Sequence, residues 1–118
     1  MSEGKFPEII TLCGSTRFKE KFEEANKRLT LENKIVISVG VFGYSDKTPL
    51  SKKEKERLDL IHKRKIDISD SIMIIDEEGY IGESTQGEIE YATKENKKIY
   101  YYSKYFKNEE EILNVTMG

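Results

Sequence analysis

Two short segments of this chain hold the residues best suited to chemistry. The first segment is Cys13-Gly14-Ser15-Thr16-Arg17. It follows an apolar run, and its hydroxyl residues stand where a helix would begin. Backbone amides at a helix start attract anions, and Arg17 adds a planar donor fork suited to phosphate or carboxylate. The residues alone predict either an anion cradle or a capped helix start with a surface arginine.

The second segment contains one carboxylate, Glu88, in the stretch from Gly82 to Ala92. We expect Glu88 in the first turn of a helix, where the helix dipole favours the ionised form. An ionised carboxylate in a crevice can act as a nucleophile or as the partner of a developing cation. The alternative is a capping box, in which Thr85 caps the helix and Glu88 bonds back to the cap.

The chain has one cysteine and one histidine, Cys13 and His62. Neither a multi-cysteine nor a two-histidine metal motif can be built from them, so we expect no metal and no cofactor. Cys13 could be a nucleophile at a helix start, but cysteine is among the residues most often buried, and we favour a buried structural role. His62 lies on a helix whose earlier turns can approach the pocket.

Alternating strands and helices position these residues. We expect strands over 8–13, 34–39, 71–75 and 98–102, the first three being apolar runs typical of buried strands. The first helix has apolar residues at spacings of four, three and four: Phe18, Phe22, Ala25 and Leu29. Ser51 and Glu54 form a capping box that opens a second helix, which ends near Ser69.

Two apolar stripes of that second helix compete for the inward face. One contains Leu58, Ile61, the stem of Lys65 and Ile68, and the other contains Leu58 and Ile66. A third helix follows a cap at Ser84 or Thr85, and a short last helix is expected over 109–114. A loop is expected over 40–49, and its first part, over 40–46, is expected to supply one wall of the pocket.

This pattern predicts one α/β domain over residues 1–118. Buried strands separated by helices indicate a parallel sheet with helices on both faces, in three layers. We expect the strand order 2-1-3-4, with room for a fifth short strand. Ligands bind such sheets where the strand order reverses. The loops over 13–17 and 76–85 should therefore face each other across one crevice.

The composition of the chain argues against some classes of binding partner. Charged residues make up 36% of the 118 residues, and the formal net charge is −2. A nucleic-acid binder usually has a basic excess, so we expect no nucleic-acid partner. No apolar run is long enough to span a membrane, and the first residues do not resemble a secretion signal. We therefore expect a cytoplasmic protein whose partner is a small molecule.

The segments Leu12–Arg17 and Ser84–Ala92 together resemble the nucleoside 2-deoxyribosyltransferase family. The first segment is closer to the branch that hydrolyses deoxynucleoside 5′-monophosphates. The resemblance covers about residues 8–102 in one consistent order of elements. It implies a flavodoxin-like (Rossmann-like) fold, a homodimer or homotetramer, and cleavage of an N-glycosidic bond.

The resemblance also assigns roles to residues. Glu88 would attack the anomeric carbon of the sugar. The 5′-phosphate would be held by Gly14, Ser15, Thr16 and Arg17. Ser84, or Gly82 through its backbone, would lie beside the sugar or phosphate. His62 stands where the family has an aspartate that holds sugar hydroxyls.

The chain departs from the family pattern at three places. Thr11 replaces a tyrosine, His62 replaces the aspartate of the helix, and Gly82 with Glu83 replaces an aspartate before the second motif. We therefore carry two hypotheses. One is a hydrolase or transferase acting on (deoxy)nucleosides or their 5′-monophosphates, and the alternative is a non-catalytic nucleotide-binding or regulatory module on the same fold.

Overall fold

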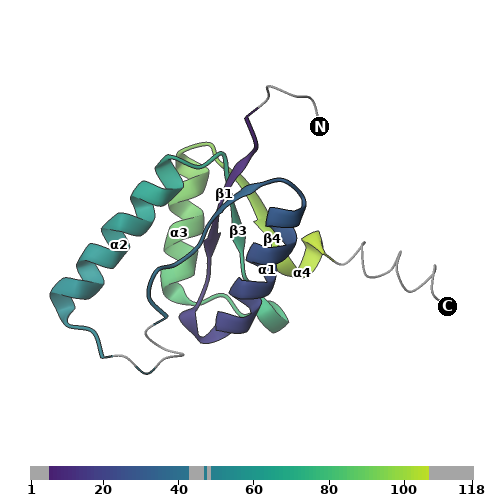
Figure 1. Ribbon diagram of the computed structural model, residues 1–118. Helices are drawn as coiled ribbons and strands as arrows, with labels where there is room; N and C mark the ends of the chain where they lie inside the picture. Colours follow the sequence, from purple (N-terminus) through teal and green to yellow (C-terminus); the bar gives the residue numbers. More distant parts are fainter. Residues whose placement is uncertain (1–5, 43–46, 48, 107–118) are drawn as a thin grey trace.

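The computed structural model describes residues 6–42, 47 and 49–106 (Figure 1). The elements, with two short 3-10 helices labelled η, run in the order β1 (Ile9–Cys13), η1 (Thr16–Phe18), α1 (Lys19–Leu31), β2 (Ile35–Ile37), α2 (Lys52–Asp67), β3 (Ser71–Ile74), η2 (Glu77–Gly79), α3 (Glu83–Lys94), β4 (Lys98–Tyr101) and α4 (Tyr102–Tyr105). The predicted helix over 109–114 lies outside the described residues.

The four strands form one parallel sheet in the order β2-β1-β3-β4. In register, Ile10 of β1 lies opposite Val36 of β2 and Ser71 of β3. The predicted α/β class, parallel sheet and strand order are therefore confirmed, and the architecture is that of a flavodoxin-like fold. Among the described residues, 6–42, 47 and 49–106, there is no fifth strand.

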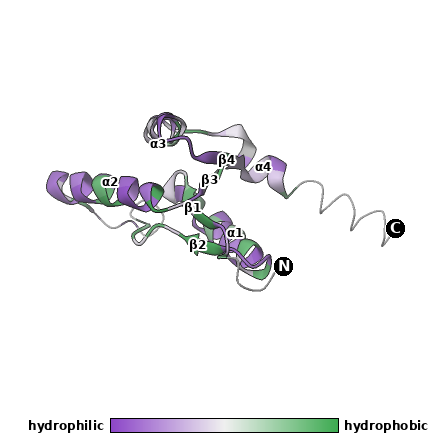
Figure 2. Ribbon diagram, turned by 90° about the horizontal axis from the view of Figure 1, so that it is seen from above, coloured by the Kyte–Doolittle hydropathy of each residue, from purple (hydrophilic) through white to green (hydrophobic). Residues whose placement is uncertain are grey.

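Alternating strand residues feed two separate cores, one on each face of the sheet. On the face covered by α1 and α4, a core of buried side chains includes Ile10, Leu12 and Met73. On the other face, Cys13 and Ile72 pack with residues of α2 and α3. Figure 2 shows α1 and α3 on opposite sides of the strands. The two cores confirm the predicted three layers.

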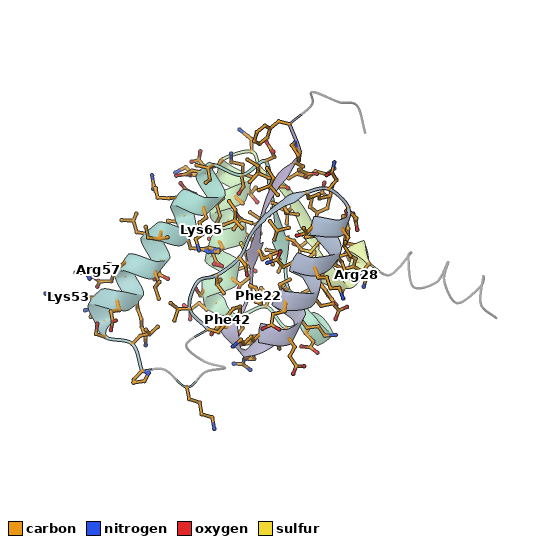
Figure 3. All side chains as sticks on the ribbon, viewed as in Figure 1. Phe22, Arg28, Phe42, Lys53, Arg57 and Lys65 are labelled. Carbon is orange, nitrogen blue, oxygen red and sulfur yellow. The ribbon has the colours of Figure 1, made fainter. Side chains whose placement is uncertain are left out.

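Helix α1 forms on the stripe that its spacing predicted. Phe22, Ala25 and Leu29 are its buried residues. The ring of Phe22 meets that of Phe42 edge-on, with centroids 5.4 Å apart, which fixes the segment after β2 against α1 (Figure 3). This contact holds the start of the long loop next to the sheet.

Helix α2 begins at the predicted capping box, in which Ser51 Oγ accepts from the backbone N–H of Glu54 and the Glu54 carboxylate accepts from that of Ser51. Ile66 is its buried residue, whereas Ile61 and Ile68 are 51% and 66% exposed. The stripe containing Ile61 and Ile68 is therefore not the inward one within a single chain. The physical reason is that the core contacts the side of α2 that carries Ile66, whereas Ile61 and Ile68 lie well round the helix from it, and the N-terminal part of α2 reaches away from the sheet (Figure 1).

The start of α3 differs from the prediction. The N-cap is Gly82, which makes no side-chain cap hydrogen bond, and Thr85 lies inside the helix with 4% of its surface exposed. Neither Ser84 nor Thr85 is the cap, and Glu88 lies in the second turn rather than the first. The predicted capping box at Thr85 and Glu88 is wrong, because an extra turn of helix begins at Glu83.

No helix among the described residues is both long enough and apolar enough to cross a membrane.

Candidate functional site

A cavity of about 720 Å³ opens at the predicted switch point of the sheet. Its lining comes from the loop after β1 (Gly14, Thr16), the segment after β2 (Val39, Gly40, Val41), the residues before α2 (Pro49, Leu50), α2 itself (Lys55, Leu58, Asp59, Ile61, His62, Lys65) and α3 (Ser84, Glu88). Motif residues from both predicted loops therefore meet in one pocket, and the segment after β2 forms a wall as expected.

Gly14 lets β1 and β3 end side by side at this pocket. Its φ is +153°, and a Cβ there would lie 3.1 Å from both Cβ and the carbonyl oxygen of Ile75. The backbone N–H of Ile75 donates to the carbonyl of Cys13 over 2.7 Å. A side chain at position 14 would push these strand ends apart, so glycine is needed for the floor of the pocket to close.

Glu88 reaches the pocket from α3. Its side chain is 19% exposed, and Oε2 lies 3.3 Å from Nε2 of His62. Burial, with a smaller contribution from the charge of Asp59, raises the pKa of Glu88 to about 8. The expectation that Glu88 is ionised near neutral pH is therefore wrong. The helix dipole fades beyond the first turn, and the cost of burying the charge prevails.

His62 completes a pair with Glu88. Burial lowers the pKa of His62 to about 4, with a further lowering by Lys65 and an opposing effect of Asp59. Near neutral pH the two side chains therefore share one proton, held mainly as the neutral carboxyl beside a neutral imidazole. The imidazole is within reach of the Glu88 proton, but the two pKa values oppose the transfer, so ionising Glu88 requires an added interaction in the pocket.

Cys13 is fully buried, as the sequence interpretation favoured. Burial and the neighbouring Glu88 raise the pKa of its thiol well above the ordinary value, so the thiol stays protonated and is a poor nucleophile. Its sulfur nevertheless lies 3.2 Å from Nε2 of His62. One donor atom each from Cys13, His62 and Glu88 lies within 4.8 Å of the others. The counts of one cysteine and one histidine predicted no metal site, yet the fold brings three potential ligands together.

Three residues of the predicted phosphate and sugar site lie beside the cavity and do not line it. Arg17 is exposed, and its guanidinium carbon sits 4.5 Å from the ring centroid of Tyr80. Its Nε donates to Oγ of Ser15 over 3.1 Å, and Gly82 forms the N-cap of α3. Contact of Ser15, Arg17 and Gly82 with a ligand therefore stays a prediction.

Three charged residues of the cavity lining, Lys55, Asp59 and Lys65, were not predicted from the sequence as site residues. Asp59 lies three positions before His62, a spacing that places both on one helix face and could have identified it. Lys65 donates from Nζ to the carbonyl of Ser38 over 2.9 Å, which joins α2 to the segment after β2. Figure 3 shows the side chain of Lys65 between α2 and the sheet. Lys65 thereby holds two walls of the pocket together.

Comparison with models of protein families, with curated proteins and with solved structures finds no significant match. The case for an activity therefore depends on the geometry of this pocket and on the motif resemblance.

Proposed function

We propose that this protein cleaves or transfers the N-glycosidic bond of a (deoxy)nucleoside or its 5′-monophosphate, with Glu88 as the nucleophile. The observation that carries the proposal is the position of Glu88. Its carboxyl group is largely buried, yet it lines a cavity at the switch point of the sheet, beside His62 and with Asp59 on the neighbouring wall. The motif resemblance selects nucleosides among the sugars that such a pocket could accept.

The chemistry requires a carboxylate oxygen to attack the anomeric carbon. As the bond from Glu88 to that carbon forms, the bond from the carbon to the base breaks, and the base leaves with the electron pair and takes a proton from solvent. Water then releases the sugar and restores Glu88, or a second base accepts the sugar. Asp59 is placed to favour the positive charge that develops on the sugar in both steps.

His62 supports this role by its position, because it can take the Glu88 proton once positive charge on the sugar has lowered the pKa of the carboxyl group. Its Nε2 lies 3.3 Å from the Glu88 carboxyl, within reach after a small movement. The transfer turns a neutral pair into a carboxylate beside an imidazolium. Positive charge developing on the sugar favours that state, so the nucleophile is generated where the substrate needs it.

The motif resemblance also suggests the location, the oligomeric state and the phosphate site of the protein. We infer from it that the protein works in the cytoplasm as a homodimer or homotetramer and uses neither metal nor cofactor in this reaction. The 5′-phosphate would be held by the loop Gly14–Arg17, which requires Arg17 to leave Tyr80 when the substrate binds.

The second candidate is a nucleotide-binding or regulatory module without catalysis. Two observations favour it: the raised pKa of Glu88 keeps the carboxyl group protonated near neutral pH, and Arg17 packs on Tyr80 outside the cavity lining. Such a module would bind the same ligands without breaking them.

Release of free base distinguishes the two. The chain is incubated with deoxyribo- and ribonucleosides and their 5′-monophosphates, with and without an acceptor base, and the base is measured by chromatography. We expect turnover that falls about 10³-fold or more in Glu88→Gln. Glu90→Gln is the matched control, because Glu90 is exposed on the same helix and lies outside the cavity lining.

The outcomes separate cleanly. Undiminished turnover in Glu88→Gln would remove Glu88 as the nucleophile. Saturable binding of a monophosphate with no base released would establish the binding module instead. A preference for monophosphates that disappears in Arg17→Gln would place the phosphate on the loop after β1.

A further inference from the structure

We propose that Cys13, His62 and Glu88 form a binding site for a divalent transition-metal ion of the zinc class beside the pocket. The three side chains come from three different elements: the end of β1, the middle of α2 and the second turn of α3. Cys13 is fully buried, and the side chains of His62 and Glu88 are 13% and 19% exposed. The donor atoms therefore converge on one point that is shielded from bulk water.

The contacts around His62 Nε2 bring two further potential metal ligands to one nitrogen atom. This one nitrogen lies 3.2 Å from the sulfur of Cys13 and 3.3 Å from Oε2 of Glu88. A ring nitrogen carries either one hydrogen or one lone pair, so it can fully satisfy only one of these neighbours at a time. A metal ion between the three groups would bind all of them.

Two of the three ligand separations are close to what zinc requires. Zinc bonds of about 2.3 Å to sulfur and about 2.0–2.2 Å to nitrogen and oxygen place tetrahedral ligand atoms roughly 3.3–3.6 Å apart. The separations of His62 Nε2 from Cys13 Sγ and from Glu88 Oε2 fall within a few tenths of an ångström of that range, and the donor atoms of Cys13 and Glu88 lie within 4.8 Å of each other. Because the groups project from two helices and a strand with their backbones fixed by the core, little rearrangement is needed.

Charge and ligand type select the metal. A thiolate and a carboxylate balance the two charges of the ion, so the loaded site is neutral, as a buried site should be. Binding releases the proton of the Cys13 thiol and that of the Glu88 carboxyl to solvent. Sulfur and imidazole ligands favour zinc, cobalt or copper over magnesium and calcium, which prefer oxygen. Three protein ligands leave a fourth position for water or a ligand, and two of these residues, His62 and Glu88, line the cavity.

One consequence rests on the proposed function. An ion held by Glu88 takes away the carboxylate that would attack the sugar. Zinc should therefore inhibit base release, and a chelator should restore it.

Cobalt provides the test, because a thiolate bound to Co²⁺ gives a near-ultraviolet charge-transfer band. Cys13 is the only cysteine of the chain, so such a band can come from no other residue. The full chain, freed of metal and kept reduced without added thiols, is titrated with Co²⁺ and then with Zn²⁺. We expect a saturable band at one ion per chain that Zn²⁺ abolishes and Mg²⁺ leaves unchanged.

Variants assign the remaining ligands. Cys13→Ser should lack the band, and His62→Gln and Glu88→Gln should each weaken metal binding by about tenfold or more. Glu90→Gln should bind as the unaltered chain does. Circular dichroism confirms that each variant is folded. The proposal is overturned if the unaltered chain shows no band, or if His62→Gln and Glu88→Gln bind cobalt with unchanged affinity, since the thiol would then act alone.

Failure of this proposal is distinguishable from failure of the proposed function. Suppose that the protein shows the cobalt band but releases no base, whether it is metal-free or loaded. The metal site is then supported and the proposed glycosidase activity is rejected. Base release by a protein that shows no cobalt band does the reverse.

Discussion

A glutamate near a helix N-terminus is ordinarily ionised, and Glu88 shows how burial reverses that expectation. The free amides and the helix dipole act mainly within the first turn, and Glu88 lies one turn further along α3. There the cost of removing a charge from water is larger, and the pKa rises to about 8. The nearest polar partner is His62, which is itself kept neutral by burial.

The raised pKa of Glu88 predicts a pH-dependent penalty on stability. The ordinary value is 4.5 and the folded value about 8, so between these values the folded state keeps a proton that the unfolded state has lost. The free energy of unfolding must therefore fall as pH rises through this window and level off above it. Glu88→Gln lacks this group, so its stability relative to the unaltered chain should grow by about 2–4 kcal/mol between about pH 6 and about pH 9.

Urea unfolding at the two pH values measures this difference. His62 titrates near pH 4 and pairs with Glu88, so the comparison is made from about pH 6 upward, where the imidazole is neutral in the folded state of the unaltered chain. Glu90→Gln, on the exposed side of α3, should follow the unaltered chain at every pH. If Glu88→Gln also did so, Glu88 would have an ordinary pKa and the pocket would be wetter than the structure indicates.

Five of the eight predicted site residues line the cavity: Gly14, Thr16, His62, Ser84 and Glu88. They could be found because each belongs to a strand end or helix start that topology brings to one crevice, or to the helix that flanks it. The contact of Cys13 with His62 could not be found, because it depends on how far α2 is rotated and tilted against β1. Sequence periodicity does not determine either quantity.

At the scale of elements, α2 has one feature that could be predicted from the sequence and one that depends on tertiary packing. Its start follows from local hydrogen bonds between Ser51 and Glu54, and such short-range chemistry can be predicted directly from residue types. Its inward face depends on tertiary packing, and two apolar stripes were equally compatible with the spacing. The structure buries Ile66 and leaves Ile61 exposed, which only the position of the sheet could decide.

Removing the cap of α2 should loosen its first turns more than it destabilises the protein. Residues 51–57 are all exposed, so the core does not hold this end of the helix. Ser51→Ala should cost about 1 kcal/mol locally, which corresponds to roughly fivefold faster amide exchange in the first turns. Hydrogen exchange measures this directly, and Ser51→Asp, which keeps a cap acceptor, is the control.

The thermal midpoint and the exchange of α3 amides should be nearly unchanged in Ser51→Ala. A large drop of the thermal midpoint would contradict this view of α2, because it would show that the exposed end is part of the cooperative core. In that case the wall of the pocket that carries Lys55 and Leu58 would be more rigid than its exposure indicates.

At the scale of the whole molecule, the strand order and the position of the pocket followed from rules for parallel sheets. Those rules do not account for the apolar stripe on α2, which stays exposed in the single chain. Ile61 and Ile68 are seven positions apart, so they lie on nearly the same line along the helix, and Leu60 beside them is 55% exposed. The stripe has the pattern of a buried face, and the single chain does not bury it.

We expect a second copy of the chain to cover this stripe, in keeping with the homodimer or homotetramer that the motif resemblance implies. Sedimentation equilibrium should give a mass of two or four chains. Leu60→Lys and Ile68→Lys, each placing a charge in the contact, should shift the protein to monomer, because an unpaired charge is costly to bury.

Leu31→Lys is the matched control, since Leu31 is 78% exposed on α1. A monomeric unaltered chain, or equal dissociation by Leu31→Lys, would show that the stripe is merely exposed. Persistence of the oligomer in both α2 variants would place the contact on another face.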